Sequence, residues 1–62
     1  MKTDLTGREI VEGGVVAFPV DNKLETGLVM GFANDEVMIN WGGVVVREPL
    51  RNVIEILSIN NQ

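Results

Sequence analysis

The sequence contains no cysteine, no histidine and no tyrosine. Without cysteine and histidine, the chain can form neither a disulfide nor a Cys/His metal site, which are common stabilisers of domains this small. The lack of histidine also removes the side chain that most often performs acid–base chemistry at neutral pH. No phosphate-binding or dinucleotide-binding glycine motif is present. We therefore expect a protein that is not an enzyme and that uses no cofactor or metal.

Basic residues are also few. The chain has five Lys and Arg against nine Asp and Glu, for a net charge of −4. Nucleic-acid binding draws much of its affinity from Lys and Arg that neutralise phosphates, and here the basic residues form no run along the chain. Nucleic acid is therefore expected to be a less favoured partner than protein.

Long apolar runs are absent as well. None approaches the roughly 18 residues that a spanning helix needs, and the segment Met1–Leu5 lacks the apolar stretch of a signal peptide. The expected location is therefore the cytoplasm, with no membrane partner.

The chain does contain many short hydrophobic segments. Hydrophobic residues make up 45% of the 62 residues, in runs separated by Gly, Asn, Asp and Pro. This punctuation is typical of strands and leaves no room for a long helix. We predict one all-β domain over residues 1–62, with strands at 15–20, 25–33, 36–41, 44–48 and 53–59.

The segments between these strands predict the connections. Residues 21–23 are expected to form a polar turn, 34–35 and 42–43 two hairpin turns, and 49–52 a single 3-10 turn. Residues 1–12 are expected to form an ordered arm that packs Ile10 against the sheet, and residues 60–62 a frayed tail. Five short strands cannot bury a sheet face unless the sheet curls, and Gly27 and Gly31 allow such bending. A small barrel over residues 13–59 is the predicted architecture.

Two segments carry a resemblance to known families. The segment Gly13–Phe18 resembles the opening of SH3-like barrels of the KOW, Tudor and CarD type, and Arg47–Val53 resembles the strand and 3-10 turn that close them. The Gly-Arg-Glu-Ile segment at 7–10 is similar to small, uncharacterised SH3-like proteins encoded by bacteriophages. The resemblance implies a five-stranded SH3-like barrel and, for a phage protein, the host cytoplasm.

A second resemblance concerns Gly27–Phe32, which is similar to the Gly-x-hydrophobic-x-Gly-Phe segment of Sm-like RNA-binding proteins. That family has an Asp where this chain has Ala33, and an Arg-Gly pair where this chain has Arg47 and Glu48. Both of the family's RNA-contacting signatures are therefore altered here, and the Sm-like reading is kept only as an alternative.

Four residues are the candidate contact residues of a binding module: Trp41, Phe32, Met38 and Arg47. Trp41 either caps the core or anchors a partner, since Trp is enriched in interface hot spots. Met38, with the neighbouring valines of residues 44–45, forms either a half-buried wall or an exposed patch. Arg47 and Arg51 either pair with Glu48 or Glu55 across a solvated surface or form a small basic spot.

Three hypotheses follow for the function. The first is a non-catalytic protein–protein interaction module, plausibly a phage accessory protein that docks on a host or phage protein. The second is a nucleic-acid-associated KOW or Sm-like barrel that stacks bases on Phe32 and Trp41. The third is a structural homo-oligomer, formed by edge-strand pairing or through the valine-rich fourth strand.

Overall fold

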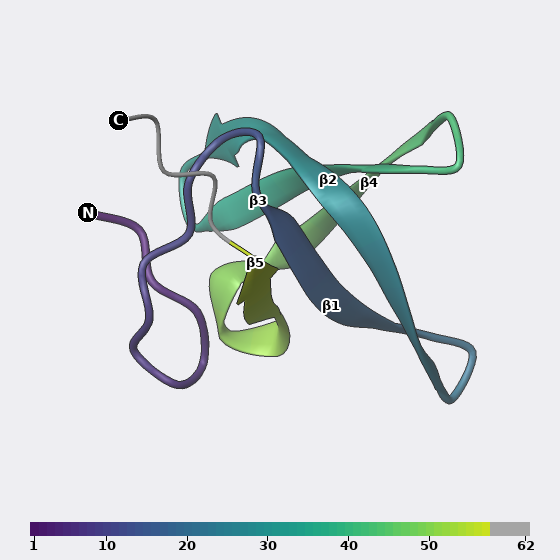
Figure 1. Cartoon of the computed structure of the whole chain (residues 1–62), viewed down its shortest axis with the longest axis horizontal. Coiled ribbons are helices and arrows are strands. Elements are labelled where there is room, and N and C mark those ends of the chain that lie inside the picture. Colours follow the sequence, from purple (N-terminus) through teal and green to yellow (C-terminus); the bar gives the residue numbers. More distant parts are fainter. Residues whose placement is uncertain (58–62) are drawn as a thin grey trace.

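The chain folds as an all-β protein, as predicted. A computed structural model describes residues 1–57 (Figure 1). Its five strands form one antiparallel sheet in the order β4-β3-β2-β1-β5. The elements are β1 (Val15–Val20), β2 (Lys23–Ala33), β3 (Glu36–Trp41), β4 (Val44–Pro49), the 3-10 helix η1 (Leu50–Asn52) and β5 (Ile54–Leu57).

The predicted boundaries were wrong at three places. Lys23, expected in a turn, begins β2 and pairs with Val20, while Pro49, expected in the 3-10 turn, ends β4 opposite Glu36. Val53, expected to begin the last strand, precedes β5 and follows η1 directly. The predicted end of the last strand at residues 58–59, and the predicted frayed tail, lie outside the described residues.

Three two-residue turns connect the first four strands. Asp21 and Asn22 have φ of 48° and 68°, and Gly42 and Gly43 have φ of 58° and 90°. Positive φ at both central positions is the pattern of type I′ turns, whose twist matches that of the flanking strands. Asn34, in the turn between β2 and β3, also has a positive φ of 58°. These turns fix the register of the sheet from β1 to β4.

The two glycines of β2 have different roles. A Cβ on Gly27 would collide with the Cγ2 of Ile39 and lie 2.8 Å from the carbonyl oxygen of Asn40, so β3 can approach only a glycine. Gly31 has space around it, but it lies at a β-bulge, because the β2–β3 register shifts between Val29 and Gly31. The bulge adds one residue, Met30, and bends the strand.

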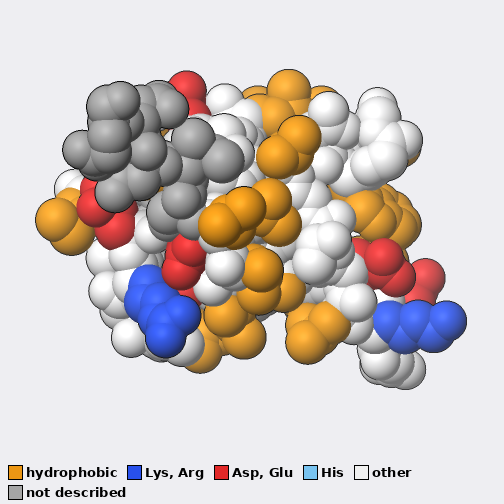
Figure 2. All heavy atoms as spheres, in the orientation of Figure 1, with side chains coloured by type: hydrophobic (Ala, Val, Ile, Leu, Met, Phe, Trp, Pro, Cys, Tyr) orange, Lys and Arg blue, Asp and Glu red, His pale blue; other side chains and the backbone are white. Residues whose placement is uncertain are grey.

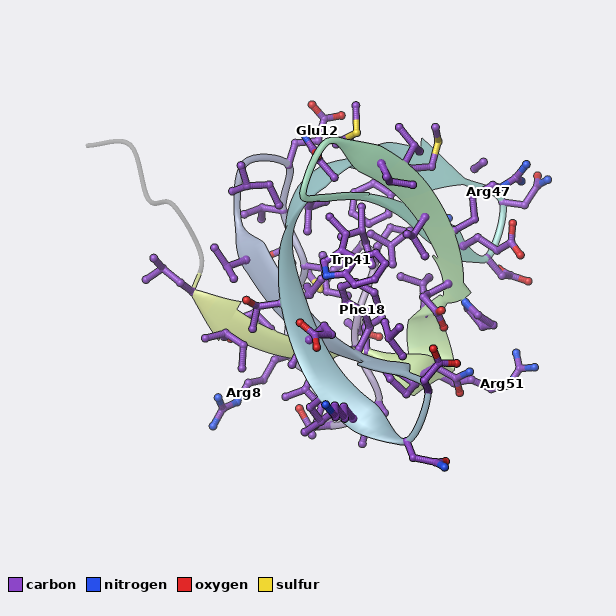
Figure 3. All side chains as sticks on the ribbon, turned by 90° about the vertical axis from the view of Figure 1, so that its right-hand side faces the viewer. Arg8, Glu12, Phe18, Trp41, Arg47 and Arg51 are labelled. Carbon is purple, nitrogen blue, oxygen red and sulfur yellow. The ribbon has the colours of Figure 1, made fainter. Side chains whose placement is uncertain are left out.

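The core lies on the inner face of the curled sheet. Seven residues that are at most 3% exposed form it, with Phe18 and Ile39 the largest. Figure 3 shows Trp41 and Phe18 on the concave side of the curved sheet, and their aromatic rings meet edge to face with centroids 6.2 Å apart. The full core set is Ile10, Val16, Phe18, Val29, Val37, Ile39 and Val53.

Ile10 of the N-terminal arm is 3% exposed and packs in the core, as predicted. The arm folds back on itself through a bridge between Thr3 and Glu9. It also runs along the outer edge of the segment that leads into β5, where the Leu5 N–H donates to the carbonyl oxygen of Val53 at 3.2 Å. The arm therefore covers one edge of the sheet.

Candidate interaction surface

One row of outward-facing residues crosses all five strands of the sheet. The ladder partners are Leu57 with Val15, Val15 with Leu28, Leu28 with Asn40, and Asn40 with Val45. Directly paired residues point to the same face. Because Val16, Val29 and Ile39 point inward, these five point outward. We call Leu57, Val15, Leu28, Asn40 and Val45 the outer row.

The outer row is hydrophobic and open to solvent. Leu28, Val45 and Leu57 are 51%, 52% and 54% exposed, and Val15 is partly buried. The one polar member, Asn40, turns its amide oxygen toward the hairpin turn, where it accepts the Gly43 N–H at 2.9 Å. Figure 2 shows hydrophobic side chains gathered over the middle of the face that β1 and β2 present, with charged groups mostly toward its two ends.

The bulge in β2 enlarges this surface. Met30, the inserted residue, is 48% exposed, and Met38 lies opposite the bulge on β3. Met38 also pairs with Arg47 across β3 and β4. Flexible methionine side chains adapt to irregular partner surfaces, so Met30 and Met38 form an adaptable flank beside the outer row.

The four predicted contact residues fall into two groups. Trp41 and Phe32 are partly buried and pack against the core, so they lie on the inner side of the sheet. Met38 and Arg47 are cross-strand partners beside the outer row. The structure therefore brings Met38 and Arg47 together and holds the two aromatic residues apart from them.

The predicted ion-pair partners of Arg47, Glu48 or Glu55, were wrong. Arg47 lies 2.8 Å from the carboxylate of Glu36, a diagonal neighbour on β3, rather than pairing with Glu48 or Glu55. Glu55 instead lies 3.9 Å from Arg8 of the arm. Within residues 1–57, Arg47 thus has a carboxylate partner, which weakens any basic spot at the 3-10 turn.

Asp4 is the only buried polar or charged residue among residues 1–57, at 6% exposed. One carboxylate oxygen accepts the Thr6 N–H at 2.8 Å, the Thr6 hydroxyl at 2.6 Å and the Arg8 N–H at 3.0 Å. The other oxygen accepts the Glu55 N–H of β5 at 2.6 Å. Burial raises the pKa of Asp4. The hydrogen bonds, led by the one from the Glu55 N–H, together outweigh this effect and lower the pKa to about 2.

Residues 1–57 contain no enclosed pocket and no cluster of three acidic side chains placed to hold a metal ion. None of the described residues belongs to a helix of the length and hydrophobicity needed to cross a membrane.

Comparisons with known proteins assign no family. A scan against protein-family models, a search of curated proteins and a search of solved structures each gave no match. The resemblance to SH3-like and phage-encoded proteins therefore stays a prediction from the short segments that carry it.

Sequence reasoning missed most of the outer row. Val15, Leu28 and Leu57 each occupy ordinary positions in strands, and only the register across β5, β1 and β2 aligns them. The alternation of large residues in β2 was a usable signal, because Leu24, Leu28 and Met30 are all about half exposed or more. It did not reveal which strands lie beside them.

Proposed function

We propose that this protein is a non-catalytic protein–protein interaction module that contacts its partner through the outer row. The observation that carries the proposal is the continuity of that row, which crosses five strands without a charged side chain. Monomeric proteins seldom leave a contiguous apolar patch of this kind exposed unless it binds something. Charged residues are typically depleted at the centre of an interface, as they are here.

We also propose that the sheet closes into an SH3-like barrel. Support comes from the strand order, from the bulge in β2 and from the 3-10 helix between β4 and β5. Such a barrel leaves an outer surface free for binding while its interior is filled by Phe18 and Trp41. A phage accessory protein that docks on a host or phage protein fits this proposal, on the strength of the Gly7–Ile10 segment alone.

Nucleic acid has less support as the partner. Arg8 and Arg47 each face a carboxylate, and the net charge is −4. Of the aromatic residues that stacking would need, Phe18 is fully buried and Phe32 and Trp41 pack against the core. Retention of single-stranded RNA or DNA on a gel at low salt would favour this alternative over the proposal.

The proposal is tested by capture with two matched variants. The wild-type chain, Leu28→Asp and Thr26→Asp would each be immobilised and exposed to lysate of the natural source. Leu28 lies in the outer row, whereas Thr26 is exposed on the same strand and the same face but pairs with Ala17, outside the row. We expect a protein that wild type and Thr26→Asp retain and Leu28→Asp loses.

A captured protein then has to bind the purified chain. We expect Leu28→Asp to raise the dissociation constant of this complex by at least about tenfold, the effect of losing one well-buried anchor. Thr26→Asp should leave the dissociation constant unchanged. Equal binding by the two variants, or no protein retained by wild type, would overturn the proposal. Circular dichroism of each variant establishes that the sheet is intact.

A further inference from the structure

The two edges of the sheet are treated differently. At β5, the arm supplies Asp4 to the Glu55 N–H and the Leu5 N–H to the Val53 carbonyl, so this edge has hydrogen-bonding partners. At β4, the sheet ends, and β3 is its only strand partner within residues 1–57. Free sheet edges are templates for pairing with another strand.

The first half of β4 also lacks the usual protection of an edge. Val44, Val45 and Val46 carry no charge and no proline, whereas the second half contains Arg47, Glu48 and Pro49. Val44 and Val45 are 57% and 52% exposed, although they point to opposite faces of the sheet. A partner that sits on one face covers only one of them. A strand added at the edge lies beside both.

The hairpin turn determines which backbone groups face this edge. Trp41 and Val44 flank the two-residue Gly42-Gly43 turn, so they form the hydrogen-bonded pair that closes it. Hydrogen bonding alternates along an antiparallel pair. The N–H and C=O of Val45 therefore point away from β3, toward the open edge.

We propose that a second copy of this chain pairs along this edge, with the two β4 strands antiparallel and centred on Val45. This inference goes beyond the proposed function and shares with it only Val45, the end of the outer row. In this register Val45 faces Val45 of the second copy, and Val44 faces Val46. Arg47 faces Gly43, so no like charges are opposed.

Other registers are poorer. Centring on Val46 places Arg47 opposite Val45 and Glu48 opposite Val44, and centring on Arg47 or Glu48 opposes like charges, which is destabilising. Centring on Val45 also joins the outer rows of the two copies into one row across ten strands. The sequence of the edge is thus self-complementary, as a two-fold interface requires.

The dimer is expected to be weak. The protein has a solvent-accessible surface of 4184 Å². Pairing of two short edge segments buries far less of it than the roughly 800 Å² per partner of a standard interface. Association should therefore become visible by sedimentation equilibrium between about 10 μM and about 1 mM, in the range of small transient interfaces.

Val45→Pro and Val45→Thr form the critical pair of variants. Proline removes the N–H that faces the edge, which an edge strand tolerates, whereas threonine keeps both the N–H and the β-branched shape. We expect Val45→Pro to weaken dimerisation at least about tenfold and Val45→Thr to retain it. If Val45→Pro fails to fold, Val45→Lys, a charged edge residue of the protective kind, is expected to give the same loss.

The outcomes separate this inference from the proposed function. A chain that stays monomeric at about 1 mM, or a dimer that Val45→Pro and Val45→Lys leave intact, overturns β4 pairing. Either result leaves standing any partner whose binding depends on Leu28. Conversely, Leu28→Asp should leave dimerisation unchanged, because Leu28 lies on β2, two strands from the edge.

Discussion

The two edges of this sheet show two ways of dealing with the same problem. At β5, a buried carboxylate from the arm accepts the Glu55 N–H, and the arm backbone donates to Val53. At β4, protection within residues 1–57 comes from side chains alone, and only in the second half, where Arg47 pairs with Glu36. One edge is thus closed by the chain itself, and half of the other is left available. The contacts at the closed edge should raise the free energy of unfolding, whereas the open edge should allow a second chain to associate.

The largest effect is expected from removing the carboxylate that closes the β5 edge. Asp4→Ala eliminates four hydrogen bonds to a charged acceptor and leaves the Glu55 N–H without this partner. We expect a loss of about 2–4 kcal/mol in the free energy of unfolding, since charged hydrogen bonds contribute most and orphaned donors cost more. Urea unfolding at neutral pH measures this loss.

Two variants calibrate the result. Thr6→Ala removes only the hydroxyl bond to Asp4, 2.6 Å long, and should cost about 1 kcal/mol. Asp35→Ala changes an exposed carboxylate in a turn and should cost less than about 0.5 kcal/mol. If Asp4→Ala were no more destabilising than Asp35→Ala, the β5 edge would not depend on its cover.

A second prediction concerns acid. The folded-state pKa of Asp4 is about 2, below its ordinary 3.8, so the unfolded chain takes up the proton first. The stability that Asp4 contributes is therefore complete above pH 3.8 and is lost as the pH falls toward 2. Urea midpoints measured across this range should fall, and should fall less steeply in Asp4→Asn. Parallel pH profiles for the two proteins would contradict this role.

The smallest effect is expected on the open side. Glu36 and Arg47 are joined at 2.8 Å, but their side chains are 39% and 56% exposed. Solvent-exposed ion pairs contribute little, so the coupling in a double-mutant cycle with alanine should be below about 1 kcal/mol and should shrink in high salt. A coupling as large as the cost of Asp4→Ala would remove the contrast between the two edges.

The sequence was informative wherever the signal was local. Gly42 and Gly43 predict a turn because few other residues adopt positive φ, and the short segment at 36–41 between two turn signals predicts a strand. Gly27 and Gly31 predict a bend in their strand. Gly31 does lie at a bulge, whereas Gly27 serves the close approach of β3 at Ile39. These inferences require only nearest neighbours along the chain.

What the sequence did not reveal depends on distant partners. In the sequence, Asp4 resembles any polar residue of a loop. Its role as a hydrogen-bond acceptor for β5 is visible only in the fold, where it lies beside the Glu55 N–H. The outer row likewise depends on the register of four separate ladders and on the bulges that shift it. Arg47 illustrates the same limit, because its carboxylate partner lies on the preceding strand and not among the acidic residues nearer in sequence.

The bond from Asp4 to the Glu55 N–H also bears on the kinetics of folding, because it joins residues 51 positions apart. Closing so long a loop costs entropy before the contact repays it. The bond should therefore form after the sheet has aligned and contribute little to the folding transition state. Asp4→Ala is then expected to accelerate unfolding while leaving the refolding rate nearly unchanged, as the two limbs of a chevron plot would record. In this sense the arm acts as a latch that determines how long the folded protein persists.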